Sequence, residues 1–124
     1  KMSIFLISHD LGVIAQHCDY VLIMYLGKIV ESGTPIDIFK SPQHPYTQAL
    51  INSIPNPDPS IKKETTLLTG DIPSPLNIPT GCRFHTRCPK AFDTCKLKEP
   101  IFQNHLESSK TSKVACHLFE NNLK

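Results

Sequence analysis

The first forty residues alternate between continuous apolar runs and a segment with helical spacing. Residues 3–8 (SIFLIS) and 20–26 (YVLIMYL) each have the length and composition of a buried strand. Between them, the apolar positions of residues 10–18 recur at helical spacing, and the aspartate that begins this segment is a suitable N-cap. Gly27 and Lys28 predict a turn into a hairpin strand, IVESG. The order strand, helix, strand predicts an α/β fold with the two apolar strands adjacent and parallel.

The pattern changes after residue 40, which predicts a division into three parts. Residues 1–40 are expected to be the end of an α/β domain, and residues 41–81 a short helix with a proline-rich linker. Eight of the 11 prolines lie between Pro42 and Pro79, and His44 stands at the entrance of the short helix as a structural residue. Residues 82–124 form a cysteine-rich part with little periodicity. Such a segment has too few apolar residues to fold by burial alone, so it needs a cross-link such as a bound metal or a disulfide.

Composition and charge narrow the classes of function. The chain has 13 basic and 11 acidic side chains, a formal net charge of +2, and only 7% aromatic residues. This balance argues against a nucleic-acid partner or a basic membrane-binding face. No export signal is visible, and the longest apolar run is too short to cross a bilayer. The expected compartment is the cytoplasm, where grouped cysteines more often bind metal or carry redox chemistry than form disulfides.

Four of the five cysteines lie in the last third of the chain, and their spacing does not decide which metal or cluster they bind, if any. The intervening segments are five, six and twenty residues long, and none is the tight C-x2–4-C pair that is usual in zinc fingers. Zinc remains an alternative because His85 and His117 stand beside candidate thiolates. Four thiolates on loose loops are equally able to hold an iron–sulfur cluster. The unligated state and disulfides also remain open for these residues: Cys82, Cys88, Cys95 and Cys116.

His9 follows the first apolar run within a Ser-His-Asp step. An imidazole at the carboxyl end of a strand points toward the ligand crevice of an α/β sheet, where it could contact a phosphate. The alternative is a histidine that caps or packs at the end of the strand, and the residues alone favour that alternative. Asp10 is expected to cap the following helix.

Longer stretches of the chain carry a resemblance. Residues 7–33 (ISHDLGVIAQHCDYVLIMYLGKIVESG) resemble the end of an ABC-transporter nucleotide-binding domain. Residues 41–59 (SPQHPYTQALINSIPNPDP), together with GCRFHTRCPKAFDTC and VACHL, are similar to the C-terminal region of oligopeptide/dipeptide importer ATPase subunits, the F-type more than the D-type. The resemblance implies a protein that uses ATP and Mg²⁺ to drive peptide import. It also implies a D-type ATPase partner, transmembrane permease subunits, and a peripheral position on the inner face of the cell membrane.

The resemblance assigns roles to particular residues. It implies that His9 is the switch histidine, which contacts the γ-phosphate in the full-length protein. It also implies a [4Fe–4S] cluster on the cysteines that match the family: Cys82, Cys88, Cys95 and Cys116. The phosphate loop, the signature segment and the Asp-Glu pair of such ATPases are not in the sequence. The chain is therefore expected to be the tail of a longer protein and not to hydrolyse ATP by itself.

The sequence is also compatible with another function and with self-association. One alternative is an independent metal-binding module for protein interaction, in which the strands of residues 1–40 only support the cysteine-rich part. A His/Cys hydrolase is set aside because no nucleophile–base pair can be identified from spacing. In isolation the apolar strands would be exposed, which predicts self-association of the chain through them.

Overall fold

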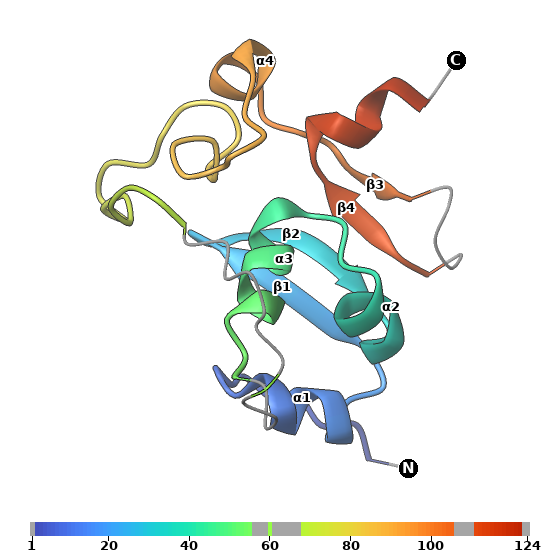
Figure 1. Cartoon of the computed structure of the whole chain (residues 1–124). Helices are drawn as coiled ribbons and strands as arrows, with labels where there is room; N and C mark the ends of the chain where they lie inside the picture. Colours follow the sequence, from blue (N-terminus) through green and yellow to red (C-terminus); the bar gives the residue numbers. More distant parts are fainter. Residues whose placement is uncertain (1, 56–59, 61–67, 106–110, 123–124) are drawn as a thin grey trace.

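Strands from both ends of the chain form a single antiparallel sheet. The computed structural model describes residues 2–55, 60, 68–105 and 111–122 of the 124-residue chain. Within these residues the strand order is β1-β2-β4-β3, and every neighbouring pair is antiparallel. Figure 1 shows the blue strands of the early chain beside the red and orange strands of its end. The strands are β1 (Val21–Tyr25), β2 (Lys28–Gly33), β3 (Phe102–Asn104) and β4 (Lys113–Ala115).

A two-residue turn joins β1 to β2. Tyr25 pairs with Lys28, so the turn consists of Leu26 and Gly27, with φ angles of 45° and 77°. Positive φ at both central residues is the geometry that matches the twist of a hairpin, and glycine adopts it without strain. The predicted hairpin is confirmed, although the turn lies one residue earlier than expected. The register also shifts between Ile23 and Met24, which gives the hairpin a β-bulge.

The first three helices begin at residues suited to capping a helix. The Asp10 carboxylate accepts hydrogen bonds from the N–H groups of Gly12 and Val13 at the start of α1. Thr34 and Asp37 form a capping box at the start of α2, with proline at the first helical position. The helices are α1 (Leu11–His17), α2 (Pro35–Lys40), α3 (Pro45–Asn52), α4 (Asp93–Leu97) and the 3₁₀ helix η1 (His117–Asn122). Among the described residues, no helix is both long and apolar enough to traverse a bilayer.

The hydrophobic core lies on one face of the β1–β2 hairpin. Alternate residues of β1 are buried, and they meet side chains from α1, α2 and the cysteine-rich segment. The other face of β1 leaves Leu22 and Met24 exposed at 42% and 56%. The buried cluster consists of Ile14, Val21, Ile23, Tyr25, Val30, Ile38 and Phe84. A residue of the late chain, Phe84, thus belongs to the same core as the early helices.

The expected first strand is not formed, which corrects the predicted parallel pair. Residues 3–8 have no regular secondary structure, and Ile4, Phe5 and Ile7 are exposed at 78%, 80% and 86%. An apolar run becomes a strand only where a neighbouring strand pairs with its backbone and other elements cover its faces. No strand among the described residues offers that pairing to residues 3–8, so β1 pairs only with β2. The fold is mixed helix and antiparallel sheet.

The first and third of the expected parts share one sheet. β4, from the cysteine-rich part, pairs with β2 through Glu31↔Val114 and Ser32↔Lys113. The separate cysteine-rich domain is therefore not confirmed, and the boundaries at residues 41 and 82 stay a prediction. Parts of the linker and of the last segment (56–59, 61–67, 106–110 and 123–124) lie outside the described residues.

Candidate functional site

A buried carboxylate ties the loop before α3 to the sheet. Glu31 of β2 is only 1% exposed, and its two oxygens accept hydrogen bonds from the N–H groups of Gln43 at 2.7 Å and His44 at 2.9 Å. Burial raises the pKa of the Glu31 carboxyl, while these hydrogen bonds oppose that rise. Sequence reasoning missed this residue. The available signal is a single acid that directly follows two apolar residues in the predicted strand IVESG.

His44 is the N-cap of α3, as its position before Pro45 predicted. Its ring is 1% exposed, and Nδ1 accepts a hydrogen bond from the Tyr46 N–H at 3.1 Å. Burial lowers the pKa of His44 to about 4. The neutral ring can accept at Nδ1, whereas the protonated ring cannot, so capping and neutrality support one another.

Phe84 connects the cysteine-rich segment to this junction. Its ring, 1% exposed, lies 5.2 Å from the Tyr25 ring in an edge-on arrangement, 5.4 Å from Tyr46 and 5.7 Å from His44. Aromatic pairs at these separations add a specific contribution to that of buried area. The side chain two residues after Cys82 is therefore held by β1 and by the start of α3. We name the four rings, Tyr25, His44, Tyr46 and Phe84, the aromatic junction.

The four late cysteines are free thiols that influence one another. Cys95 and Cys116 are buried, Cys82 and Cys88 are half-buried, and the Cys82 N–H donates to the Cys95 carbonyl at 2.8 Å. Burial, with a smaller contribution from charge on the other three thiols, raises the pKa of Cys116 to about 12. The four sulfur atoms thus lie within electrostatic reach of one another.

The geometry of these thiols does not by itself form a metal site. Over the part of the chain that the structure describes, no group of three or more His, Cys, Asp or Glu side chains is arranged to hold a metal ion. The donor set, four unpaired thiols, nevertheless suits a soft metal or an iron–sulfur cluster in its chemistry. The cluster on Cys82, Cys88, Cys95 and Cys116 accordingly stays a prediction.

The two histidines beside the thiols already have hydrogen-bond partners. His85 Nδ1 lies 2.8 Å from the Cys82 carbonyl oxygen. His117 is 3% exposed, and its ring nitrogens lie 2.6 Å from a Glu120 carboxylate oxygen and 2.7 Å from the Lys98 carbonyl oxygen. Both nitrogens of His117 are thereby engaged. This arrangement favours four thiols over a mixed histidine–cysteine set as the donors to any metal.

His9 lies outside this region. It is exposed in the segment before α1, and the flanking residues Ser8 and Asp10 form a local turn in which the Asp10 N–H donates to Ser8 Oγ at 3.0 Å. The capping role of Asp10 is confirmed, and the phosphate contact of His9 stays a prediction. The structure does not bring His9 together with the cysteines into one site.

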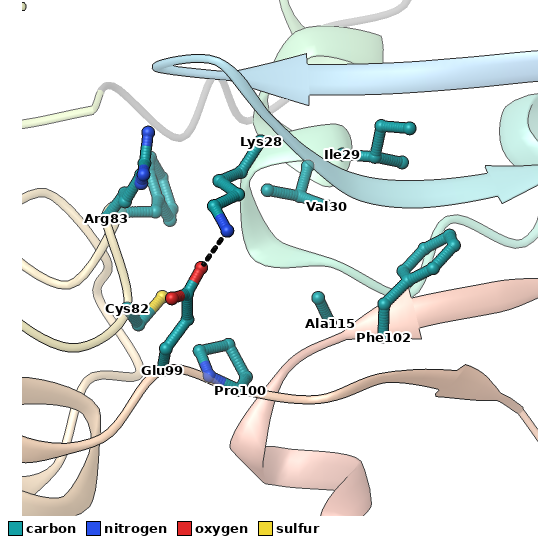
Figure 2. Close-up of a pocket in the computed structure, with 10 residues that line it drawn as sticks. Lys28, Ile29, Val30, Cys82, Arg83, Glu99, Pro100, Phe102 and Ala115 are labelled. Carbon is teal, nitrogen blue, oxygen red and sulfur yellow. Dashed lines mark ion pairs between the residues drawn. The ribbon is translucent and has the colours of Figure 1, made fainter.

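A cleft of about 340 Å³ lies between the hairpin and the cysteine-rich segment (Figure 2). The Lys28 ammonium and the Glu99 carboxylate face one another across it at 3.0 Å. Beside them, the Arg83 guanidinium donates to the Leu26 carbonyl of the hairpin turn. The cleft could not be predicted from spacing, because Lys28 lies 55 positions before Arg83 and 71 before Glu99.

Comparisons with known proteins place these features in a family context. Residues 30–95 match the family described as "Oligopeptide/dipeptide transporter, C-terminal region". A putative peptide import ATP-binding protein of Brucella ovis is 50% identical over 99 residues, which cover 80% of this chain and 31% of that protein. The dipeptide transport ATP-binding protein DppF of Haemophilus influenzae is 44% identical over 93% of this chain and 34% of its own. The oligopeptide transport ATP-binding protein AppD of Bacillus subtilis is 47% identical, with coverage of 95% and 35%.

The chain spans about a third of the length of these curated relatives, 31–35%. The matched region, residues 30–95, includes Glu31, the aromatic residues from His44 to Phe84, and three of the four late cysteines. The relatives have both F-type and D-type names, so the expected preference for the F-type stays a prediction.

Proposed function

Because the chain belongs to the family of oligopeptide/dipeptide transporter C-terminal regions, we propose that it is the C-terminal part of a peptide importer's ATP-hydrolysing subunit. The observation that carries this proposal is the family match over residues 30–95, together with relatives named as peptide, dipeptide and oligopeptide ATP-binding proteins. In this role the complete subunit binds ATP and Mg²⁺. It works with a D-type ATPase and permease subunits at the inner face of the membrane.

Within that subunit, this chain's contribution is the joint between the sheet and the cysteine-rich segment. Glu31 holds the loop before α3, His44 caps α3, and Phe84 inserts into the same aromatic junction. Movement of the β1–β2 hairpin would thereby be transmitted to the cysteine-rich segment as a packed unit. The relatives named above are ATP-binding proteins by name, so they do not support the alternative of an independent metal-binding interaction module.

His9 is the proposed contact to the γ-phosphate. Phosphoryl transfer depends on positioning and charge stabilisation, and one imidazole without a phosphate loop cannot supply these. This chain alone should therefore show no ATPase activity. In the complete subunit, His9→Ala should lower turnover by about 100-fold and leave the Kd for ATP nearly unchanged, because the contact is made chiefly in the transition state.

The matched control for this experiment is His17→Ala, which replaces an exposed histidine of α1 with the best helix former. Steady-state ATP hydrolysis and nucleotide titration measure the two effects. Turnover that is unchanged in His9→Ala would contradict the assignment, and so would ATP hydrolysis by the 124-residue chain alone.

The four late thiols are the proposed ligands of a [4Fe–4S] cluster with a structural role. Such a cluster, when bound, would cross-link the segment; the residues that would hold it are Cys82, Cys88, Cys95 and Cys116. Material purified without oxygen should contain about four iron and four sulfide ions per chain. Replacing any one of these cysteines by serine should deplete the metal and loosen the segment.

Cys18→Ser is the matched control, because Cys18 lies at the end of α1 and packs against the core beside the sheet. It should change neither the metal content nor the folding of the cysteine-rich segment. If the purified chain contained one equivalent of zinc and no iron, the proposed iron–sulfur cluster would be wrong and a structural zinc site would take its place. Four titratable thiols with an unchanged fold would remove the metal hypothesis.

The exposed apolar front of the chain supports a proposal of self-association in isolation. Ile4, Phe5 and Ile7 are exposed, and β1 stands at an edge of the described sheet. An unpaired strand edge and an exposed apolar segment each favour pairing between copies. Light scattering should show a mass that increases with concentration. A constant monomer mass at high concentration would contradict this.

A further inference from the structure

The cleft between the hairpin and the cysteine-rich segment has charges at one end and apolar side chains at the other (Figure 2). Lys28, at the start of β2, pairs with Glu99 at 3.0 Å, and both side chains are about half exposed, at 50% and 53%. An ion pair with this exposure contributes little to stability. It can therefore open toward a ligand without disrupting the fold.

Arg83 also lines the cleft, but its guanidinium already donates to the Leu26 carbonyl. The opposite charges of Lys28 and Glu99 therefore restrict the ligands that fit between them. A simple anion bound to Lys28 would lie beside the Glu99 carboxylate, and a simple cation bound to Glu99 would lie beside the Lys28 ammonium. Either would place like charges together or leave one group without its partner. A zwitterion inserted between them gives each side chain a new partner of opposite charge, so the charge balance is conserved.

Apart from Arg83 and Cys82, the remaining wall of the cleft is apolar. It is formed by Val30, which is 6% exposed, by Phe102 at 39%, and by Pro100 and Ala115. The volume of about 340 Å³ is near the lower end of the range of ~300–1,000 Å³ for small-ligand pockets. That size suits a molecule with one or two amino-acid side chains.

We propose that this cleft binds a zwitterionic amino acid or dipeptide with an apolar side chain. Its carboxylate pairs with Lys28, its ammonium group pairs with Glu99, and its side chain contacts Val30 and Phe102. The recognition uses only residues of this chain, so it is independent of the ATPase role proposed above. A free amino acid and a dipeptide share this chemistry, and the probes below distinguish them.

The test is a titration of the full chain with leucine and with leucyl-leucine, followed by ¹H–¹⁵N NMR. Residues around Lys28, Glu99 and Phe102 should shift and saturate with at least one of the two probes, and the tighter probe identifies the source. N-acetylleucine lacks the ammonium group, leucinamide lacks the carboxylate, and glycine lacks the side chain. Each should bind about tenfold more weakly or worse.

Variants then test the two charged contacts. Lys28→Gln and Glu99→Gln should each weaken binding by about tenfold or more, whereas Lys40→Gln, at an exposed position of α2, should leave it unchanged. The exchange variant Lys28→Glu/Glu99→Lys should restore binding above either single variant, because both partners are again present. Circular dichroism checks that each variant keeps the fold.

Several results would overturn the proposal. They are the absence of saturable shifts with both probes at millimolar concentration, equal binding of N-acetylleucine and leucine, and binding that Lys28→Gln leaves unchanged. Equal weakening by Lys40→Gln would show a general charge effect and would also overturn it.

Discussion

The early sheet-and-helix region and the late cysteine-rich segment are held together by different forces. Residues 11–52 bury one face of a hairpin under short helices, each with a defined cap. Residues 81–99 contain a single short helix, and their order depends on backbone hydrogen bonds such as Cys82 N–H to the Cys95 carbonyl. Most of the core belongs to the first region, whereas the second contributes the fully buried Phe84.

This difference predicts that the late segment depends on the early one for its folding. Phe84 lies in the aromatic junction, Arg83 donates to the Leu26 carbonyl, and Lys28 pairs with Glu99. Each of these contacts joins the two regions. The comparison predicts that changes at the contacts loosen the late segment first, while the hairpin and its helices persist.

Phe84→Ala should have the largest effect, because it removes the side chain that inserts into the other region. Loss of a fully buried phenylalanine costs about 4 kcal/mol of unfolding free energy. Chemical denaturation measures the loss, and hydrogen exchange should show the late segment opening before α1 and β1. Phe92→Ala, at a ring 39% exposed in the same segment, should cost under about 1 kcal/mol. Equal losses in the two variants would contradict the dependence.

Gly81→Ala should have the second-largest effect. Gly81 has φ of +71°, and a Cβ there would lie 2.4 Å from the Cys95 carbonyl oxygen and 2.7 Å from the Lys96 carbonyl carbon. Both are backbone atoms, so the segment must shift, at a cost of about 3 kcal/mol. Gly70 also has a positive φ, 86°, but the atom nearest to an added Cβ there would be 3.7 Å away. Gly70→Ala should cost only about 1 kcal/mol, and equal losses would show that backbone conformation alone is responsible.

Acid should weaken the junction through His44. Its pKa falls from 6.5 to about 4 on folding, so between these values the unfolded chain binds more protons. Stability from His44 is therefore present above pH 6.5 and is lost as the pH falls toward 4, by up to about 3 kcal/mol. Glu31 acts in the opposite sense, because its raised pKa costs stability as the pH rises above 4.5.

The variant His44→Asn separates these two contributions, because asparagine can still cap α3 but does not titrate. Urea unfolding of both proteins at pH values from 7 to 4 measures the difference. Stability should fall less steeply with acid in His44→Asn than in the unmodified chain. Identical profiles would show that the pKa of His44 does not change on folding.

The Lys28–Glu99 pair should have the smallest effect on stability. Both side chains are about half exposed, so a double-mutant cycle with alanine should give a coupling of about 0.5 kcal/mol. The coupling should vanish near ~1 M salt, where charges are screened within a few ångströms. A coupling that persists at high salt would mean that the pair contributes more to joining the two regions than its exposure indicates.

Local features of the fold could be predicted because neighbouring residues decide them. Asp10, Thr34 and His44 cap helices at the places where their sequence context predicts a helix to begin. The hairpin between residues 20 and 33 also follows from its glycine and its apolar run. Pairing between distant strands could not be predicted in this way: residues 3–8 were expected to be a strand, whereas β4 was not expected to pair with β2.

The sequence by itself determined where the first three helices begin, that a hairpin follows residue 20, which cysteines are grouped late in the chain, and which family the chain resembles. Tertiary structure alone decided that Glu31 is buried beneath the loop before α3, that Phe84 belongs to the early core, and that Lys28 meets Glu99. The physical reason is distance along the chain. A cap or a two-residue turn involves atoms a few residues apart, whereas these contacts require the whole backbone to bring separate segments together.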